Sequence, residues 1–236
     1  MTWRWRTCFS RWLVAALLVP AALAASVEGT VELRTKAGIR VKDRSNVLIW
    51  LTPRNARPVP APQHTRMLQK GKMFIPHLLV VDVGSTVDFP NLDPIFHNAF
   101  SNFNGQIFDI GLYAPGQSRP IVFRRPGIVR VFCNIHPTMS AVIAVLETPY
   151  FAVSRADGTY AIHDVPPGSY EMRVFEERAT EETLTALARV IQVNEGANPQ
   201  QAIRVEQSDF LPLQHKNKYG QDYPHEDHAD GYGGPQ

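Results

Sequence analysis

Residues 129–139 have the sequence VRVFCNIHPTM, in which a strand-like run ends in a dense group of possible metal ligands. The first five positions are rich in β-branched and aromatic side chains, as strands are. A thiol, an imidazole and a thioether then follow within one short loop, at Cys133, His136 and Met139. Taken alone, a free cysteine is often a small buried apolar residue. Together, the three side chains predict a metal site at the end of a strand.

A second histidine completes this set. His97 lies upstream, in the segment DPIFHN at 93–98, just after another predicted strand at 86–89. Two histidines and a cysteine in a trigonal arrangement, with a weak axial methionine, are the ligands of electron-transfer copper sites. Sulfur ligands favour Cu(I) and nitrogen ligands favour Cu(II), so a mixed set changes little when an electron moves. We expect one copper ion, cycling between Cu(I) and Cu(II), held by His97, Cys133, His136 and Met139.

The remainder of the chain predicts an all-β fold. Short apolar runs are separated by turn residues such as those at 84–85, 126–127 and 157–158. Runs this short and evenly spaced are typical of a β-sandwich or barrel. Four prolines between 53 and 62 indicate a linker or an edge crossing, and 179–187 is the one helical candidate. The predicted strands are 27–33, 47–51, 77–83, 86–89, 107–110, 121–123, 128–133, 141–146, 150–154, 159–162 and 170–175.

From about residue 72 to 146 the chain resembles a cupredoxin, a member of the blue-copper family. The resemblance rests on FIP at 74–76, GSTVDF at 84–89, NLD at 91–93 and VRVFC at 129–133. Two residues separate Cys133 from His136 and two separate His136 from Met139, which resembles the ligand loop of amicyanin. The wider pattern, HNAFS at 97–101 and FDIG at 108–111, is similar to exported proteins grouped as methylamine-utilization proteins.

The resemblance implies a Greek-key β-sandwich over 66–148, with His97, Cys133, His136 and Met139 as its copper ligands. Asn98 matches the position whose side chain ties the two ligand loops together and whose backbone N–H bonds the cysteine sulfur. Such contacts outside the ligand set hold geometry and tune potential. His136 matches the ligand whose ring edge lies near the surface and serves as the electron port.

A second resemblance lies after the copper region. ADGTY at 156–160 and VPPGSY at 165–170 resemble the second half of a carboxypeptidase regulatory-like (transthyretin-like) sandwich. These strands are too few to bury a core alone, and the first half of the pattern appears at 27–31 and 47–51. We therefore expect a small second β-sandwich made of 26–53 and 149–207, with the cupredoxin region inserted. The alternative is that 27–51 adds strands to the cupredoxin sheet, and strand pairing distinguishes the two.

The first 24 residues have the pattern of a signal peptide. Arg4, Arg6 and Arg11 precede an uncharged run that ends in Ala22-Leu23-Ala24. That run is about 13 residues long, against the roughly 20 that a membrane-spanning helix needs, so an uncleaved anchor is the weaker alternative. Cleavage would place the protein in the periplasm and remove Cys8, which leaves Cys133 without a disulfide partner. A lone thiol in an oxidising compartment suggests that something occupies it.

After Leu213 the chain contains almost no aliphatic side chains, and we expect 208–236 to be a disordered tail. His215, His225 and His228 stand there among acidic residues and could bind copper or zinc loosely, although a solvated tail is the favoured interpretation. Removing the three leader arginines from the 24 basic residues leaves 21 against 22 acidic residues. A net charge near zero gives no reason to expect nucleic acid or anionic lipid as a partner.

The leading hypothesis is a periplasmic electron carrier, not an enzyme, that exchanges single electrons with periplasmic redox proteins. A copper carrier or buffer that delivers the metal to another protein is the alternative, and the tail histidines favour it mildly. An enzyme with Cys133 as nucleophile and His136 as base would need a third, orienting group, and no motif supplies one. A metal-free binding module is disfavoured by the complete ligand set.

Overall fold

The computed structural model describes residues 25–55, 61–102, 105–208 and 215–223. The predicted signal peptide, 1–24, lies outside these residues. The regular secondary structure of the described chain is almost all strand, which confirms the all-β class. One helix, α1 (Glu181–Leu187), falls within the predicted 179–187, and the Oγ1 of its N-cap Thr180 accepts a hydrogen bond from the Thr183 N–H. No helix among the described residues could cross a membrane, since α1 is only seven residues long.

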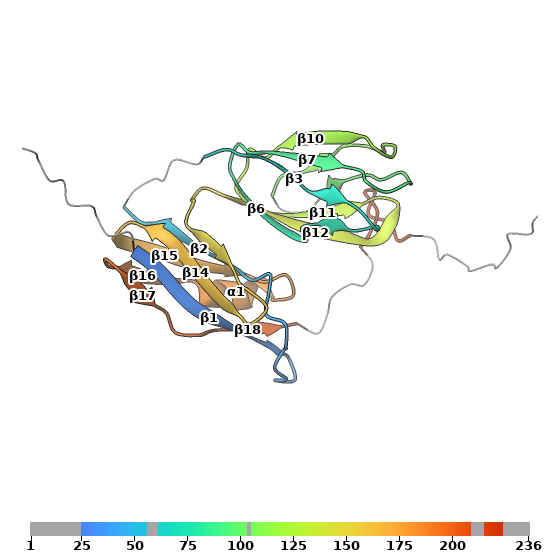
Figure 1. Ribbon diagram of the computed structural model, residues 1–236. Coiled ribbons are helices and arrows are strands. Elements are labelled where there is room, and N and C mark those ends of the chain that lie inside the picture. The colour runs from blue at the N-terminus through green and yellow to red at the C-terminus, as the bar shows by residue number, and fades with distance from the viewer. Residues whose placement is uncertain (1–24, 56–60, 103–104, 209–214, 224–236) are drawn as a thin grey trace, which may run out of the picture.

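The described strands form five sheets, and the four larger ones make two sandwiches (Figure 1). One sandwich, here called the flanking sandwich, contains the first and the last strand of the described chain. One of its sheets has the order β14 (Thr159–Val165), β1 (Ala25–Thr35) and β17 (Ala197–Pro199), with β18 (Ile203–Gln207) also pairing with β1. The other has the order β13 (Phe151–Val153), β2 (Leu48–Pro53), β15 (Gly168–Phe175) and β16 (Arg189–Val193).

The other two sheets form the central sandwich. The inner sheet has the order β6 (Leu78–Asp82), β12 (His136–Leu146), β11 (Gly127–Cys133), β8 (Phe100–Ser101) and β9 (Phe108–Asp109). The outer sheet has the order β10 (Ser118–Val122), β7 (Thr86–Pro90) and β3 (His64–Arg66), and a short hairpin joins β4 (Leu68–Gln69) to β5 (Phe74–Ile75).

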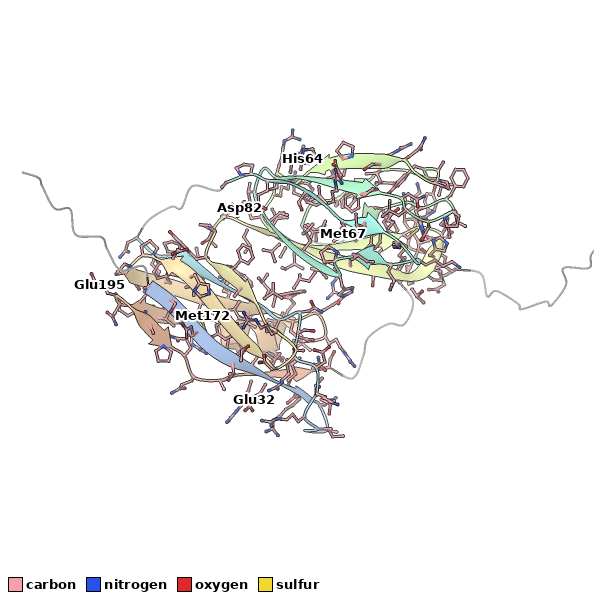
Figure 2. The ribbon with its side chains drawn as sticks, in the orientation of Figure 1. Glu32, His64, Met67, Asp82, Met172 and Glu195 are labelled. Carbon is pink, nitrogen blue, oxygen red and sulfur yellow. The ribbon has the colours of Figure 1, made fainter. Side chains whose placement is uncertain are left out.

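Each sandwich has its own apolar core. Met67 lies in the core of the central sandwich and Met172 in that of the flanking sandwich, and both are fully buried (Figure 2). The central core joins β7 to β11 and β12 through residues such as Phe89, Val131 and Ile143. Burial of apolar surface on this scale is the main favourable contribution to folding.

A third apolar cluster joins the two sandwiches. Leu78, Val142 and Ala144 of the inner sheet pack against Leu48 and Phe175 of β2 and β15. β12 is therefore buried on both faces, which explains why 141–146 is a continuous apolar run and not an alternating one.

Strand pairing places the N-terminal strands in the flanking sandwich. β2 pairs with β15 from Leu48 opposite Phe175 to Pro53 opposite Tyr170, and it also pairs with β13. β1 pairs with β14, β17 and β18. Within the described residues, neither strand pairs with a strand of the central sandwich. The central sandwich thus lies, in sequence, between two parts of the flanking one.

Candidate metal centre

The end of the β11–β12 hairpin carries three of the predicted ligands. The antiparallel ladder runs from Gly127 opposite Val145 to Phe132 opposite Ser140, and then shifts so that Cys133 lies opposite His136. This shift ends the regular ladder and forms a tight loop in which both side chains can turn toward one point. Met139 follows in the first part of β12.

His97 comes from the connection between β7 and β8. It forms a two-way backbone bridge with Tyr113, in which the His97 N–H donates to the Tyr113 carbonyl at 3.2 Å and the Tyr113 N–H donates back at 2.9 Å. The Tyr113 hydroxyl in turn donates to the Phe89 carbonyl of β7 at 2.8 Å. These contacts pair the backbone groups of His97 and hold its segment against that of Tyr113.

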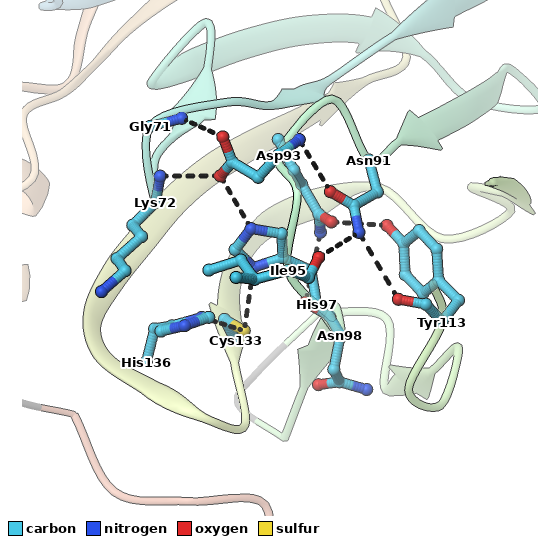
Figure 3. Close-up of polar contacts among 11 residues, drawn as sticks. Gly71, Lys72, Asn91, Asp93, Ile95, His97, Asn98, Tyr113, Cys133 and His136 are labelled. Carbon is cyan, nitrogen blue, oxygen red and sulfur yellow. Dashed lines mark hydrogen bonds and ion pairs between the residues drawn. The ribbon is translucent and has the colours of Figure 1, made fainter. Parts of the chain in front are cut away.

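The structure brings His97, Cys133 and His136 together (Figure 3). Cys133 Sγ lies 3.8 Å from His97 Nδ1 and 3.4 Å from His136 Nδ1, and all three atoms are within 4.8 Å of one another. Metal bonds of about 2.0 Å to nitrogen and 2.3 Å to sulfur, separated by ~120°, put the two ligand atoms about 3.7 Å apart. The observed spacing therefore fits a trigonal metal ion with two nitrogen ligands and one sulfur ligand.

Burial differs among the four predicted ligands. Cys133 and His97 are fully buried, whereas His136 is half-buried. Met139 is buried in the same apolar cluster as Cys133. The structure thus gathers three ligand atoms at one point and places the thioether in the core beside them.

Burial and backbone hydrogen bonds have opposite effects on the Cys133 thiol. Burial raises the pKa of the Cys133 thiol, while the backbone N–H groups of Ile135, Asn98 and His136 act in the opposite direction. A buried thiol with several backbone donors aimed at its sulfur is poorly ionised on its own, but a bound cation deprotonates it.

A buried carboxylate orients His97, and the sequence reasoning did not identify it. Asp93 Oδ2 lies 2.8 Å from His97 Nε2, and the Asp93 carboxylate also accepts hydrogen bonds from the backbone N–H groups of Gly71 (2.6 Å) and Lys72 (2.9 Å). Burial alone would raise the pKa of Asp93, but these donors and His97 hold it below its usual value. The ionised carboxylate only accepts, so Nε2 carries the proton and Nδ1 keeps its lone pair for the metal.

Asn98 connects three segments of the site. Its Oδ1 accepts from the Asn134 N–H at 3.2 Å, and its Nδ2 donates to Asp109 Oδ1 at 2.7 Å. Its backbone N–H points at the Cys133 sulfur. One side chain thus links the His97 segment, the ligand loop and β9.

Residues 215–223 lie against the ligand loop. The His215 ring is 4.5 Å from the Phe132 ring, and the Tyr223 hydroxyl donates to the Cys133 carbonyl at 2.9 Å. The segment has no aliphatic residues for a core of its own, but its aromatic and polar groups bind a surface that already exists. His225 and His228 lie outside the described residues.

No protein-family model matches the sequence, and no similar curated protein was found. Solved structures resemble part of the chain. A copper-containing nitrite reductase from Thermus scotoductus SA-01 is 27% identical over 41% of this chain, with a TM-score of 0.34, and the match spans 26% of that protein. A purple cupredoxin from Nitrosopumilus maritimus is 24% identical over 35% of this chain and 99% of its own (TM-score 0.32), and a reduced amicyanin mutant is 18% identical over 41% and 99% (TM-score 0.33).

Proposed function

We propose that this protein is a periplasmic blue-copper electron carrier of the cupredoxin type. One copper ion would be held by His97, Cys133 and His136, with Met139 as a weak axial ligand, and when bound it supplies one-electron redox chemistry. The observation that carries the proposal is the convergence of one buried Sγ and two imidazole Nδ1 atoms within 4.8 Å. This is the donor set and the trigonal arrangement of electron-transfer copper.

The surroundings favour electron transfer because they hold the ligands in one geometry. His97 is oriented by Asp93, which is itself fixed by two backbone N–H groups. Cys133 and His136 lie on a hairpin whose strands are packed on both sides. A site that keeps the same geometry in both oxidation states needs little rearrangement when an electron moves.

His136 is the expected point of electron entry and exit. It is half-buried, unlike the fully buried His97 and Cys133. The segments that carry the ligands also expose apolar side chains, with Leu92 53%, Phe96 52% and Ile135 42% exposed. Exposed apolar side chains near a redox centre suit brief docking of periplasmic redox proteins.

The burial of Cys133 argues against an enzyme that uses it as a nucleophile. Its side chain is inaccessible to solvent, and burial raises the pKa of the thiol. Reactive cysteines instead lie in partly exposed sites that lower the pKa.

A visible spectrum tests the proposal. Stoichiometric Cu(II) added under oxidising conditions should give an intense charge-transfer band from the Cys133 thiolate. The variant Cys133→Ala should lack the band, while His64→Ala, which changes an exposed histidine on β3, should keep it. A wild-type protein that stays colourless would contradict the proposal.

We also propose that the two sandwiches are two domains: a copper domain at about 66–148, and a discontinuous carboxypeptidase regulatory-like sandwich from 26–53 and 149–207. Separate apolar cores and separate sheets support this division. Met172→Ala opens a cavity in the flanking core and should destabilise that sandwich. The midpoint of the unfolding transition followed by circular dichroism should therefore shift more than the midpoint followed by the copper band. Equal shifts of the two signals would contradict the division.

A further inference from the structure

We propose that residues 215–223, here called the clamp, restrain the ligand loop at 133–137 in the conformation that binds the copper. The inference rests on the proposed function for the identity of the metal. Its structural part, that the clamp restrains the loop, is independent of any metal.

The clamp contacts the backbone of the ligand loop at both of its ends. The Tyr223 hydroxyl donates to the Cys133 carbonyl at 2.9 Å, and the His215 N–H donates to the Pro137 carbonyl at 3.1 Å. The His215 ring also places Nε2 3.2 Å from the His136 carbonyl. The carbonyls of Cys133 and His136, the two ligand residues of this loop, thus both meet groups of the clamp.

A closed ring of hydrogen bonds joins the clamp to the rest of the site. The Lys218 N–H donates to Asn134 Oδ1 at 2.9 Å, and the Asn134 N–H donates to Asn98 Oδ1 at 3.2 Å. Asn98 Nδ2 donates to Asp109 Oδ1, and Lys218 Nζ reaches Asp109 Oδ2, each at 2.7 Å. The ring connects the clamp, the ligand loop, the His97 segment and β9.

The clamp has its own internal structure and aromatic contacts. Asn217 closes a turn through its N–H to the Gln221 carbonyl and through Oδ1, which accepts from the N–H groups of Tyr219 and Gln221. The His215 ring packs between Phe132, at 4.5 Å, and Tyr223, at 5.4 Å. This turn and its aromatic contacts already place Lys218 and Tyr223 close together. Less conformational entropy is therefore lost when these residues bind the loop.

The consequence concerns copper retention. Two of the proposed ligands lie on this loop, so the metal can leave readily only when the loop opens. Each hydrogen bond between clamp and loop lowers the population of the open form. The clamp therefore favours a protein that keeps its copper over one that hands it on.

Amide hydrogen exchange of Asn134, Ile135 and His136 in the metal-free protein tests the restraint. Tyr223→Phe removes one hydroxyl and Lys218→Met removes one ammonium, and each should speed exchange about fivefold, as expected for the loss of one net hydrogen bond. The matched control is Lys216→Met, on an exposed side chain of the same segment, and it should leave exchange unchanged.

The same variants loaded with Cu(I) test the consequence. Copper loss to an excess of chelator should speed up about fivefold in Tyr223→Phe and Lys218→Met, in proportion to loop opening, and should stay the same in Lys216→Met. Unchanged exchange in both clamp variants would overturn the inference. Faster exchange in a protein that binds no copper would support the restraint and overturn the proposed function instead.

Discussion

Met139 is the proposed ligand whose effect on the metal is best separated from its effect on the fold. It is buried beside Cys133 in the central core, and leucine has a similar volume. Met139→Leu should therefore keep copper bound and raise the reduction potential, because loss of a weak donor disfavours Cu(II). Voltammetry of the two proteins measures the shift. An unchanged potential would mean that the Met139 sulfur does not face the metal.

Asp93 should affect the metal through His97. Asp93→Asn removes the charge that accepts from Nε2, which makes the imidazole a weaker donor. We expect copper affinity to fall about 10- to 100-fold, as is typical for outer contacts of this kind, with a rise in potential. Asp88→Asn is the matched control. Asp88 lies in β7, and its carboxylate pairs at 2.9 Å with His64, an exposed histidine that is not a proposed ligand. Equal affinities in competition with a chelator would show that Asp93 has no such role.

The spacing of Cys133, His136 and Met139 was sufficient to select these residues as candidates, because a short loop limits how far apart they can lie. Asp93 was not identified, since its role depends on the backbone N–H groups of Gly71 and Lys72 meeting it from another hairpin. Its position four residues before His97 was the one available signal. His215 lay in a segment whose composition indicated disorder, and composition does not show that a surface exists to receive it.

The strand β12 is the element on which both packing layers depend. Val142 faces the flanking sandwich and Ile143 faces the central core, and both are buried. Ile143→Val should lower the free energy of unfolding by about 0.5–1.5 kcal/mol. Val142→Ala should lower it by about 1–2 kcal/mol, since two methyl groups lose their burial.

Val190→Ala is the control for this pair, because Val190 on β16 is 56% exposed. A substitution there should change stability by less than about 0.5 kcal/mol. Chemical denaturation of the three variants makes the comparison. A neutral Val142→Ala would mean that the outer face of β12 is not packed.

The same strand shows what apolar patterning can predict. Continuous apolar runs at 47–51 and 141–146 predicted strands, and these became β2 and β12. β18 was missed, although Ile203, Val205 and Gln207 alternate with exposed residues and are buried. β3, β4 and β5 are two or three residues long. Strands this short have no periodicity to detect, because tertiary contacts alone define them.

At the scale of the whole molecule, an ion pair joins the two sandwiches. His77 Nε2 lies 2.5 Å from Glu177 Oε2, and Arg130 also approaches Glu177, at 3.9 Å. The hydrogen bond to Glu177 raises the pKa of His77 above 6.5. Burial would raise the pKa of Glu177, but His77 and Arg130 hold it below 4.5. Asp43, Glu176 and Arg178 line the same 290 Å³ cavity between the sandwiches.

Because the pKa of His77 is raised, its contribution to the free energy of unfolding is complete below pH 6.5. That contribution is lost as the pH rises through the pKa of His77 in the folded protein. Because the pKa of Glu177 is lowered, its contribution to the free energy of unfolding is complete above pH 4.5. That contribution is lost as the pH falls through the pKa of Glu177 in the folded protein. The contact is therefore strongest between these two limits. His77 is 44% exposed, so solvent screening keeps the effect below about 1 kcal/mol.

Thermal unfolding at about pH 5.5 and about pH 8.5 measures this contribution. The wild type should lose more stability on going to the higher pH than His77→Gln does. His163→Gln, which changes an exposed histidine on β14, should behave like the wild type. Identical pH dependence in all three proteins would exclude His77 as the titrating group.

The placement of β2 beside β15 also imposes an order of assembly on the growing chain. Leu48 is synthesised long before its partner Phe175, and everything between them must be made first. Closing so long a loop of unfolded chain is entropically costly, whereas the central sandwich needs only residues that emerge together. As the chain emerges N-terminus first, we expect the central sandwich to form first and so to shorten the loop. β1 and β2 would stay unpaired, with their apolar side chains exposed, until the C-terminal strands are available to pair with them.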